Sequence, residues 1–297
     1  MKVTKSTIFV FFLEIVLIVL GVVAFSPASL SALQQVILIT ILTALLSFAY
    51  SLFTHDYSWT DRLWSTLPVA YAWIYALAAS FHAGALVAAL LITLWGARLT
   101  YNFARRGGYT GEEDYRWRIL NKRIGNPFGW IIFNLLFIAS YQQFLFIAFT
   151  SPLSLLSEQS SPAFTPLSFL AIMLFFLCLG IETLADQQQY TFQQAKYHLL
   201  ERDARLSEEY ERGFRTSGLF KHSRHPNYFG ELGVWWSIYL FCVSFHTSLF
   251  HFTIAGPILL TLLFIGSTIF TESITSSKYP EYAAYKKQVP AILFRFW

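Results

Sequence analysis

The chain has 297 residues, of which 55% are hydrophobic, 19% are aromatic and only 13% are charged. Soluble domains carry about 25% charged residues, so this composition excludes an ordinary soluble protein and indicates one embedded in a lipid bilayer. The net charge of +4 is spread over loops and forms no basic patch that would bind nucleic acid. Cys178 and Cys242 lie inside apolar runs, which indicates buried small side chains rather than a disulfide or a zinc site.

Eight apolar runs predict an all-α, polytopic membrane bundle of about eight spanning helices, within a range of seven to nine. Most runs approach the roughly 20 residues that a helix needs to cross a bilayer. Only His82 and small residues separate the short third run from the fourth, so these two form either a helical hairpin or one broken helix. The runs are 7–25, 33–53, 67–81, 83–99, 128–150, 166–185, 228–245 and 252–270.

The lysines and arginines predict the orientation of the bundle. They occur at Lys2, Lys5 and Arg62 and then cluster in residues 98–123, 196–224 and 278–295. The intervening loops, 26–32, 82–84, 151–165 and 246–251, contain none. Because basic loops stay in the cytoplasm, the pattern predicts eight spans with both termini cytoplasmic. The first apolar stretch is long for a cleaved signal peptide, so an uncleaved anchor is favoured.

Glu14 is an ionisable residue inside the first predicted helix. Such a residue either faces a cavity or partner, or is a neutral side chain bonded within the bundle. After the fourth run, Arg105 and Arg106 precede two glycines. Paired guanidinium groups next to a backbone that a ligand can approach suit phosphate binding. For either arginine alone, ordinary cytoplasmic charge is the simpler interpretation.

The sixth run ends in Glu182 and Asp186, which are four residues apart and share one helical face. Two carboxylates at the cytoplasmic end of a spanning helix are unusual. A polar helix is expected to continue through residues 202–212, with charge pairs on a solvated face. Gly213 and Gly218 are expected to interrupt it.

A second helix is predicted to begin at Pro226, because proline suits the first helical turn. Asn227, Tyr228 and Glu231 then lie in its first two turns, with Asn227 and Glu231 four residues apart. Polar groups gathered at a helix N-terminus form a natural site for a phosphate or a carboxamide.

Arg224 and His225 directly precede this helix and add cationic groups to its N-terminus. His222 and His225 have no clear third ligand at zinc spacing, so we predict no metal.

The sequence RHPNYFGE at residues 224–231 resembles the C-terminal domain of the steroid 5-alpha-reductases. Gly218-Leu219-Phe220 before it and Trp235-Trp236 after it add to the likeness. The chain is even more similar to a largely uncharacterised bacterial membrane branch of that superfamily, over roughly residues 90–297. Three further features fit that branch: Glu182 through Asp186, the arginine-rich loop that ends at residues 113–116, and the tail 278–285. Sterol reductases and isoprenylcysteine carboxyl methyltransferases share a related RHPxY element, which alone does not choose between NADPH and S-adenosylmethionine.

The resemblance implies roles for individual residues. Asn227 matches an asparagine that holds the nicotinamide carboxamide, Glu231 a carboxylate of the same pocket, and Asp186 an aspartate near the nicotinamide ribose. Glu182 stands where steroid reductases have asparagine. Arg98 is taken as the shared anchor for matching this chain to the family, and Arg105 and Arg106 lie near the family's Asn-Arg-Gly-Arg phosphate-binding loop. The complete set of NADPH-binding residues implied in this way is Arg98, Arg105, Arg106, Glu182, Asp186, His222, Arg224, His225, Asn227, Tyr228, Glu231, Lys278 and Tyr282.

The chain also departs from the steroid reductases. Trp95 stands where they carry a catalytic tyrosine, and Ser65-Thr66 replaces a Gln-Glu pair before Leu67-Pro68. The resemblance therefore supports binding of the cofactor but does not support a steroid as the substrate. We expect residues 1–85 to face the substrate and residues 86–297 to bind the cofactor. Candidate proton donors are Glu14, Tyr101 and Tyr228.

The leading hypothesis is an oxidoreductase acting on CH-CH groups with NADPH, similar to 3-oxo-5-alpha-steroid 4-dehydrogenases and acting in lipid metabolism. It would reduce an activated C=C bond in a lipophilic steroid-, sterol- or prenoid-like substrate, in a bacterial inner membrane with the cofactor on the cytoplasmic side. The first alternative is an S-adenosylmethionine-dependent methyltransferase, which would not need Arg105 and Arg106 for a 2′-phosphate. The second is a non-catalytic membrane protein or a transporter, although a transporter would place its polar residues near the midplane.

Overall fold

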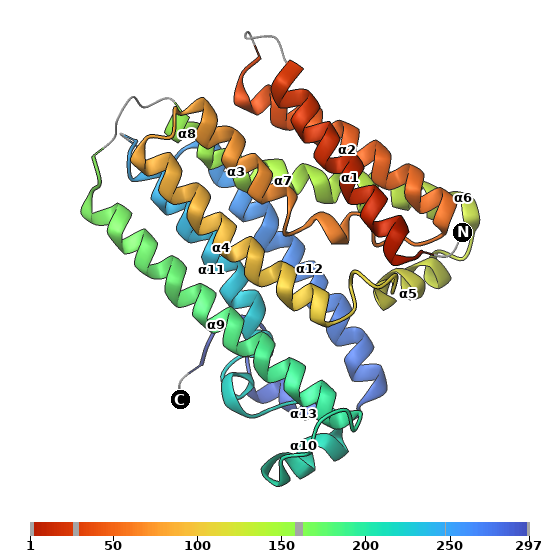
Figure 1. Cartoon of the computed structure of the whole chain (residues 1–297). Helices are drawn as coiled ribbons and strands as arrows, with labels where there is room; N and C mark the ends of the chain where they lie inside the picture. The colour runs from red at the N-terminus through yellow and green to blue at the C-terminus, as the bar shows by residue number, and fades with distance from the viewer. Residues whose placement is uncertain (1–2, 26–29, 158–162, 247, 296–297) are drawn as a thin grey trace. The chain divides into compact units, whose positions relative to one another are not determined.

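The computed structural model describes residues 3–25, 30–157, 163–246 and 248–295, and within these ranges it contains helices and no strands (Figure 1). The predicted all-α class is therefore confirmed. The chain forms two compact units. Unit 1 comprises Met1–Thr165 and Cys242–Gly256, and unit 2 comprises Pro166–Phe241 and Pro257–Trp297. The predicted division at residue 85 separates a part that faces the substrate from a part that binds the cofactor. The two compact units do not test that division, and it stays a prediction.

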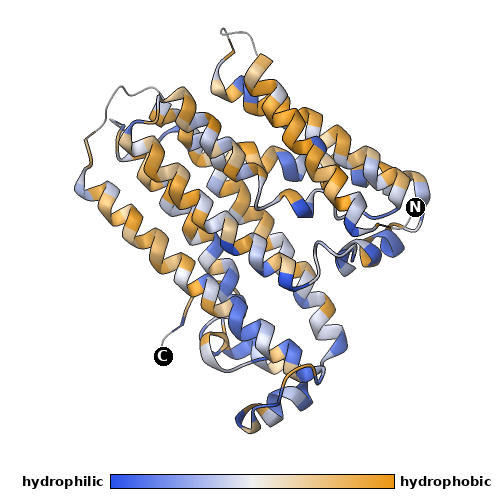
Figure 2. Cartoon of the chain, in the orientation of Figure 1, coloured by the Kyte–Doolittle hydropathy of each residue, from blue (hydrophilic) through white to orange (hydrophobic). Residues whose placement is uncertain are grey.

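Six segments among the described residues are long and apolar enough to cross a membrane, and Figure 2 shows their apolar character. They are Lys5–Phe25, Ala32–Thr54, Ala83–Arg105, Pro127–Ser157, Pro166–Lys196 and Phe252–Lys278. The other two predicted runs also form helices: a 12-residue helix at Leu67–Ala78 and an 18-residue helix at Pro226–Val243. Each predicted apolar run is thus helical.

Unit 1 contains most of the helices. Its elements are α1 (Lys5–Phe25), α2 (Ala32–Thr54), η1 (Asp61–Leu63), α3 (Leu67–Ala78), α4 (Ala83–Arg105), α5 (Tyr115–Ile124), α6 (Pro127–Phe133), η2 (Asn134–Tyr141), α7 (Gln142–Thr150), η3 (Ser151–Leu153), α8 (Ser154–Ser157) and η6 (Phe252–Ile254). Segment η2 is π-helical and joins α6 to α7 without a break.

Helices α3 and α4 form a helical hairpin, which resolves the alternative that the sequence left open. Ser80 and Phe81 take left-handed φ values of 51° and 55° in the connection. A Cβ atom on Gly96 would lie 2.4 Å from Cγ2 of Val69 and 2.6 Å from the carbonyl oxygen of Ser65. The end of α4 therefore packs against the start of α3, and only glycine permits this approach.

The loop after α2 closes around a buried ion pair. Nη2 of Arg62 lies 2.7 Å from Oδ2 of Asp56, and the Arg62 side chain has no exposed surface. Nε of Arg62 also donates to the carbonyl oxygen of Gly108, at 3.1 Å, and the guanidinium lies 4.7 Å from the ring centroid of Trp59. This arginine therefore links the loop after α2 to the glycine turn after α4.

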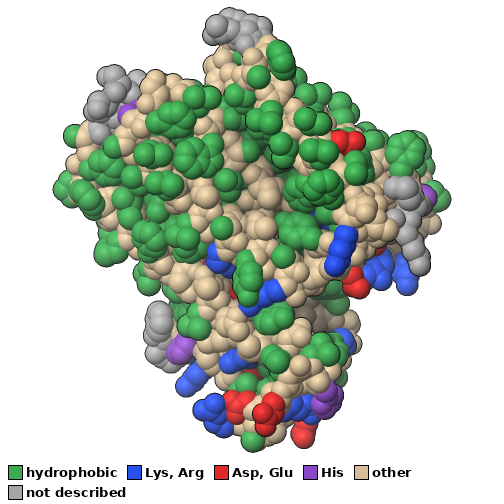
Figure 3. All heavy atoms as spheres, viewed as in Figure 1, with side chains coloured by type: hydrophobic (Ala, Val, Ile, Leu, Met, Phe, Trp, Pro, Cys, Tyr) green, Lys and Arg blue, Asp and Glu red, His purple; other side chains and the backbone are tan. Residues whose placement is uncertain are grey.

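The elements of unit 2 are α9 (Pro166–Lys196), η4 (Ala204–Leu206), α10 (Ser207–Arg212), η5 (Gly218–Lys221), α11 (Pro226–Val243), α12 (Ala255–Lys278) and α13 (Tyr282–Gln288). The last two residues of α11 and the first two of α12 fall within residues 242–256 and therefore belong to unit 1. On the face shown in Figure 3, charged side chains gather at the end of unit 2 that carries α10. Helix α11 begins at Pro226 as predicted. Gly213 ends helix α10 with a φ of +86°, as predicted, whereas Gly218 has a φ of +64° and begins η5.

The predicted continuous polar helix through residues 202–212 is wrong. Helix α9 ends at Lys196, and His198 takes a left-handed φ of 59°. The side chain of Asp203 then accepts a hydrogen bond from the backbone N–H of Arg205 and caps a new short helix, η4. A left-handed residue cannot continue a right-handed helix, and an aspartate at an N-cap favours a fresh start.

Helices α9 and α11 cross closely at two glycines of α11. A Cβ atom on Gly230 would lie 2.5 Å from Cβ of Glu182 and 2.8 Å from the carbonyl oxygen of Cys178. A Cβ atom on Gly233 would lie 2.3 Å from Sγ of Cys178. This crossing fixes which side chains of the two helices face each other.

Candidate functional site

The α9–α11 crossing gathers four polar side chains that the sequence had singled out. Glu182, Asp186 and Glu231 are 3%, 4% and 6% exposed, and Asn227 is half-buried. Nδ2 of Asn227 lies 3.5 Å from Oδ1 of Asp186, which is long for a hydrogen bond. Oε1 of Glu231 accepts a hydrogen bond of 3.1 Å from the Trp235 indole. Buried carboxylates and an amide in apolar helices are costly, which marks this cluster as a candidate ligand site.

The loop before α11 is docked on α9 by one glutamine. Oε1 of Gln188 accepts from the backbone N–H of Leu219 at 3.0 Å. A Cβ atom on Gly218 would lie 2.6 Å from that same oxygen. The backbone oxygen of Gln188 accepts from Nη1 of Arg215 at 2.8 Å. Gln188 therefore holds the start of the candidate motif against the helix that carries Asp186.

Arg224 and His225 are both bonded to Glu272 of α12. Nε and Nη2 of Arg224 lie 2.6 Å and 3.1 Å from the two carboxylate oxygens, a bidentate arrangement. Nε2 of His225 lies 3.1 Å from Oε1, and Nζ of Lys286 lies 3.2 Å from Oε2. The Glu272 side chain is only 4% exposed. Three basic side chains thus converge on one buried carboxylate.

The C-terminal tail is bound along the segment that precedes α11. Nη1 of Arg224 donates to the backbone oxygens of Lys286 and Val289. The backbone N–H groups of Arg224 and His225 donate to the carbonyl oxygens of Pro290 and Ala291, at 3.0 Å and 2.9 Å. All three side-chain nitrogens of Arg224 therefore have partners inside unit 2.

Tyrosines of the tail pack as a small aromatic core. Phe214, Tyr282 and Tyr285 form a buried cluster with Tyr279 beside it. Burial raises the pKa of the Tyr282 hydroxyl, which also lies 3.4 Å from Oε1 of Glu272. Burial likewise raises the pKa of Tyr285. Both phenols therefore remain protonated at neutral pH.

Tyr279 differs from its aromatic neighbours. Nζ of Lys196 donates to its hydroxyl at 2.7 Å, and Nζ of Lys278 lies 5.3 Å from its ring centroid. Partial burial raises the pKa of Tyr279, but hydrogen bonds from the two lysines outweigh this effect and bring the pKa below its ordinary value. Lys278 is thus held beside the tail, at the end of α12.

Two further predicted residues of the motif contact neighbouring rings and backbone. The Tyr228 ring stacks on His225, with centroids 5.0 Å apart, and meets Phe264 edge-on at 4.8 Å. Nδ1 of His222 lies 2.8 Å from the carbonyl oxygen of Arg295. Both residues therefore help to hold the tail and α12 around the start of α11.

The remaining predicted site residues lie in unit 1. Glu14 accepts a hydrogen bond of 2.8 Å from the Tyr50 hydroxyl, so this carboxyl has a partner within its unit. Tyr101 is 66% exposed, and the Arg105 guanidinium lies 5.4 Å from its ring centroid while bonding Oδ1 of the neighbouring Asn102. Residues Arg98 and Arg106 lie on α4 and at its C-cap, and Trp95 is fully buried.

The structure thus brings Asp186 beside Asn227 and Glu182 against Gly230, next to Glu231 in the chain, and it gathers Arg224, His225 and Tyr282 around Glu272. Their assignment to cofactor binding stays a prediction. Among the described residues, no group of three or more His, Cys, Asp or Glu side chains could hold a metal ion.

Sequence reasoning missed Glu272, Lys286 and Gln188. Glu272 carried a usable signal, because it is an acid two residues beyond a predicted apolar run, where an ionisable residue calls for a partner. Lys286 and Gln188 carried none, since lysines and glutamines are common in polar helical segments.

Comparisons with known proteins give a family and one related protein. The sequence profile of a family described as "Protein of unknown function (DUF1295)" matches residues 47–289. "Uncharacterized protein C594.04c" of Schizosaccharomyces pombe (strain 972 / ATCC 24843) is 36% identical over 251 residues, which cover 80% of this chain and 73% of that protein. No solved structure gives a significant match. The family profile includes both polar clusters of unit 2.

Proposed function

This chain belongs to the DUF1295 family, described as proteins of unknown function, and on that premise we propose that it is an NADPH-dependent membrane reductase of an activated C=C bond. The observation that carries the proposal is the close α9–α11 crossing, where Glu182 lies against Gly230 and Asp186 lies beside Asn227. The likeness of residues 224–231 to the steroid 5-alpha-reductases and their bacterial branch adds support.

The donor set of this cluster fits the nicotinamide end of the cofactor. The Asn227 amide offers both a hydrogen-bond donor and an acceptor to a carboxamide. Its 3.5 Å contact with Asp186 is long for a hydrogen bond, so binding a carboxamide would cost little. Carboxylates such as Asp186 accept hydrogen bonds from ribose hydroxyls. The bound cofactor would supply a hydride to the substrate. Glu231, held by the Trp235 indole, would line the same pocket.

A proton must also reach the substrate, and Tyr228 is our preferred donor. It lies in the same first turn of α11 as Asn227, whereas Glu14 and Tyr101 lie in unit 1. Its ring is held between His225 and Phe264, which fixes its direction. A positioned phenol can act as a general acid or can stabilise a developing enolate oxygen.

The helices support the proposed topology and a lipophilic substrate. Six apolar segments, with α3 and α11 in addition, support eight spans with both termini and the cofactor site on the cytoplasmic side. A lipophilic steroid-, sterol- or prenoid-like substrate would enter from the bilayer. The likeness to the bacterial branch favours a bacterial inner membrane.

The engagement of Arg224 favours a second candidate, an S-adenosylmethionine-dependent methyltransferase. Every side-chain nitrogen of Arg224 has a partner in Glu272 or in the tail. The guanidinium group of the RHPxY element is therefore engaged within the protein and is not directed to a cofactor phosphate. S-Adenosylmethionine has no phosphate that would need it, and carboxylates such as Asp186 suit the ribose of either cofactor.

Ligand-induced stabilisation distinguishes these functions. The protein, purified in mild detergent, is heated with NADPH, NADH or S-adenosylmethionine, and the melting temperature is measured. A ligand at 100 times its Kd adds about 2.7 kcal/mol to the stability of the folded state. The reductase proposal expects a shift with NADPH, and the methyltransferase expects one with S-adenosylmethionine. The absence of any shift at saturating NADPH refutes the reductase.

A matched pair of variants tests the placement of the site. Asn227→Ala should lose the NADPH shift, because it removes the only amide of the cluster among the described residues. Asn121→Ala, a similarly half-buried residue of α5, should retain the shift. If Asn227→Ala kept a normal NADPH shift, the assignment of the α9–α11 cluster to the cofactor would be wrong.

A further inference from the structure

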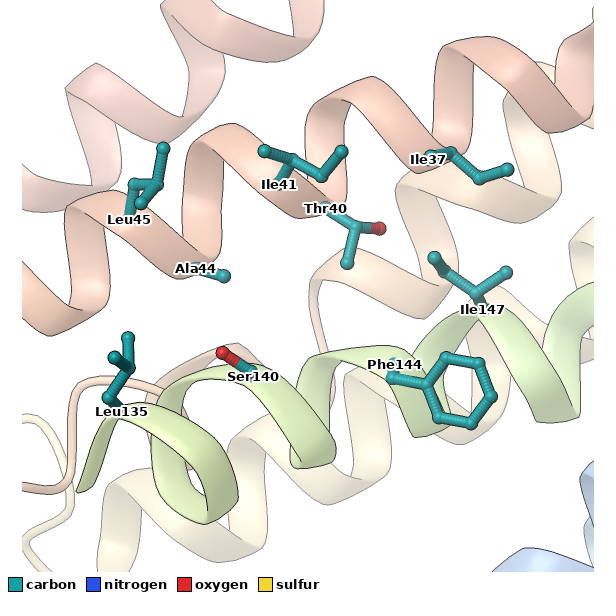
Figure 4. A pocket seen from close by; sticks show the side chains of 9 residues that line it. All are labelled: Ile37, Thr40, Ile41, Ala44, Leu45, Leu135, Ser140, Phe144 and Ile147. Carbon is teal, nitrogen blue, oxygen red and sulfur yellow. The ribbon is translucent and has the colours of Figure 1, made fainter. Parts of the chain in front are cut away.

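Unit 1 contains a hollow of about 460 Å³ between α2 and the η2–α7 segment (Figure 4). This volume lies within the roughly 300–1,000 Å³ typical of small-molecule sites. Its lining comes from Ile37, Thr40, Ile41, Ala44 and Leu45 of α2, and from Leu135, Ser140, Phe144 and Ile147 of η2 and α7. Figure 4 shows the lining side chains of α2 on one side of the hollow and those of η2 and α7 on the other.

The π-helical segment η2 shapes this hollow. Hydrogen bonds from residue i to residue i+5 widen a helix, and π segments are rare and are often found at functional sites. Asn134, at the start of η2, donates to the Ser51 hydroxyl of α2 at 2.6 Å. Just past its end, Gln143 accepts from the Thr43 hydroxyl at 2.6 Å and donates to Ser47 at 3.2 Å. Polar contacts therefore link α2 to residues on either side of η2, which indicates a built cavity.

The chemistry of the lining selects an apolar ligand. Of the side chains that line the hollow in the described part of the chain, none is ionisable. The Thr40 hydroxyl donates to the carbonyl oxygen of Val36 at 2.7 Å and, as acceptor, lies 2.8 Å from the Tyr71 hydroxyl. Only Ser140 then offers a further hydroxyl. Such a lining would leave a charged or strongly polar head group without partners, which is costly.

The residues beside the mouth of the hollow are apolar and exposed. Both lining segments belong to candidate membrane spans. Ile41, Leu45 and Phe144, at 51%, 57% and 49% exposure, present apolar side chains beside it. We propose that this hollow is a binding site for one hydrocarbon chain of a membrane lipid, which enters sideways from the bilayer and lies along η2. The proposal is independent of the cofactor and of the proposed reaction.

Photolabelling tests the site on the whole protein. A palmitic acid with a diazirine in its chain is added to the protein in detergent micelles and irradiated, and the labelled peptides are identified by mass spectrometry. We expect saturable labelling within residues 37–45 and 135–147, which unlabelled palmitic acid reduces at least fivefold. Labelling that rises linearly and spreads equally over exposed residues of α1, such as Leu17 and Leu20, would overturn the proposal.

A pair of tryptophan substitutions on α2 sharpens this test. Ala44→Trp fills the hollow from its wall and should reduce the labelling at least fivefold. Leu42→Trp introduces the same ring two residues away, at a position that is 37% exposed and does not line the hollow, and should leave the labelling unchanged. Equal labelling of two folded variants would contradict the proposal. If Ala44→Trp does not fold, the saturation and competition of the wild-type labelling decide alone.

Discussion

The ion cluster around Glu272 makes the sharpest prediction about stability. Glu272→Gln keeps the shape of the side chain but removes the negative charge that neutralises Arg224, whose side chain is only 9% exposed. Breaking a buried ion pair by removing one partner costs about 3–5 kcal/mol, because the remaining charge stays buried without compensation. The bidentate contact to Arg224 dominates this cost, since Lys286 is 38% exposed and screened by solvent.

Thermal unfolding in detergent measures the effect. For a chain of this size, a loss of about 3–5 kcal/mol lowers Tm by on the order of 10 °C. Because Arg224 also binds the backbone of the tail, limited trypsin digestion should cut more rapidly after Lys286 and Lys287 in the variant. Glu281→Gln serves as the control, because Glu281 is an exposed carboxylate of the same tail and should change Tm little.

A double-mutant cycle decides whether the cost belongs to the pair. Arg224→Met combined with Glu272→Leu replaces both charges with apolar groups, so the double variant should lose less stability than the two single changes together. A coupling energy of about 1–3 kcal/mol is expected for residues in direct contact. Strictly additive losses, or a Glu272→Gln variant as stable as Glu281→Gln, would refute the reasoning.

Two further predictions concern a helix crossing and a titrating carboxyl. Gly230→Ala should lower the free energy of unfolding by about 1–3 kcal/mol, because its new Cβ meets the backbone of α9. Gly266→Ala on α12 is the control, because its new Cβ meets open space and should not destabilise the protein. Thermal unfolding in detergent compares the two variants, and equal Tm values would contradict the close crossing. Burial, and then the charge of Asp114, raises the pKa of Asp61 from 3.8 to about 6. The resulting stability is present below pH 4 and is lost as the pH rises through 6, by about 1–2 kcal/mol for this half-buried group. Asp61→Asn should flatten that pH dependence and be the more stable form at pH 7, provided that it keeps its contact with Trp117; an unchanged pH profile would show that Asp61 does not titrate there.

Much of the candidate site was predictable because its signals are local. The start of α11 at Pro226 and the breaks at Gly213 and Gly218 follow from the backbone preferences of proline and glycine. The spacing of Glu182 and Asp186 places them on one helical face wherever that helix packs. The sequence did not predict that these residues form two separate polar clusters, because it does not say which basic side chain meets which acid.

The break after α9 shows how a local rule failed. Residues 197–203 contain no glycine or proline, so charge spacing alone predicted a continuous helix. In the structure, His198 leaves the helix with a positive φ, and Tyr210 of α10 stacks on Phe192 of α9 at 5.1 Å. Packing of an aromatic pair outweighed helix propensity, which is a weak preference of less than about 1 kcal/mol per residue.

By itself, the sequence determined the apolar helices, because bilayer-length hydrophobic runs satisfy their backbone hydrogen bonds only as helices in an apolar medium. It also determined where several of them begin and end, through residues whose backbone preferences act within one turn. Only the tertiary structure decided that Glu272 binds Arg224 and His225, and that Asp186 lies beside Asn227. These contacts join residues more than 40 positions apart, and they depend on helix crossings such as the one at Gly230, where a single missing Cβ atom sets how closely two helices approach.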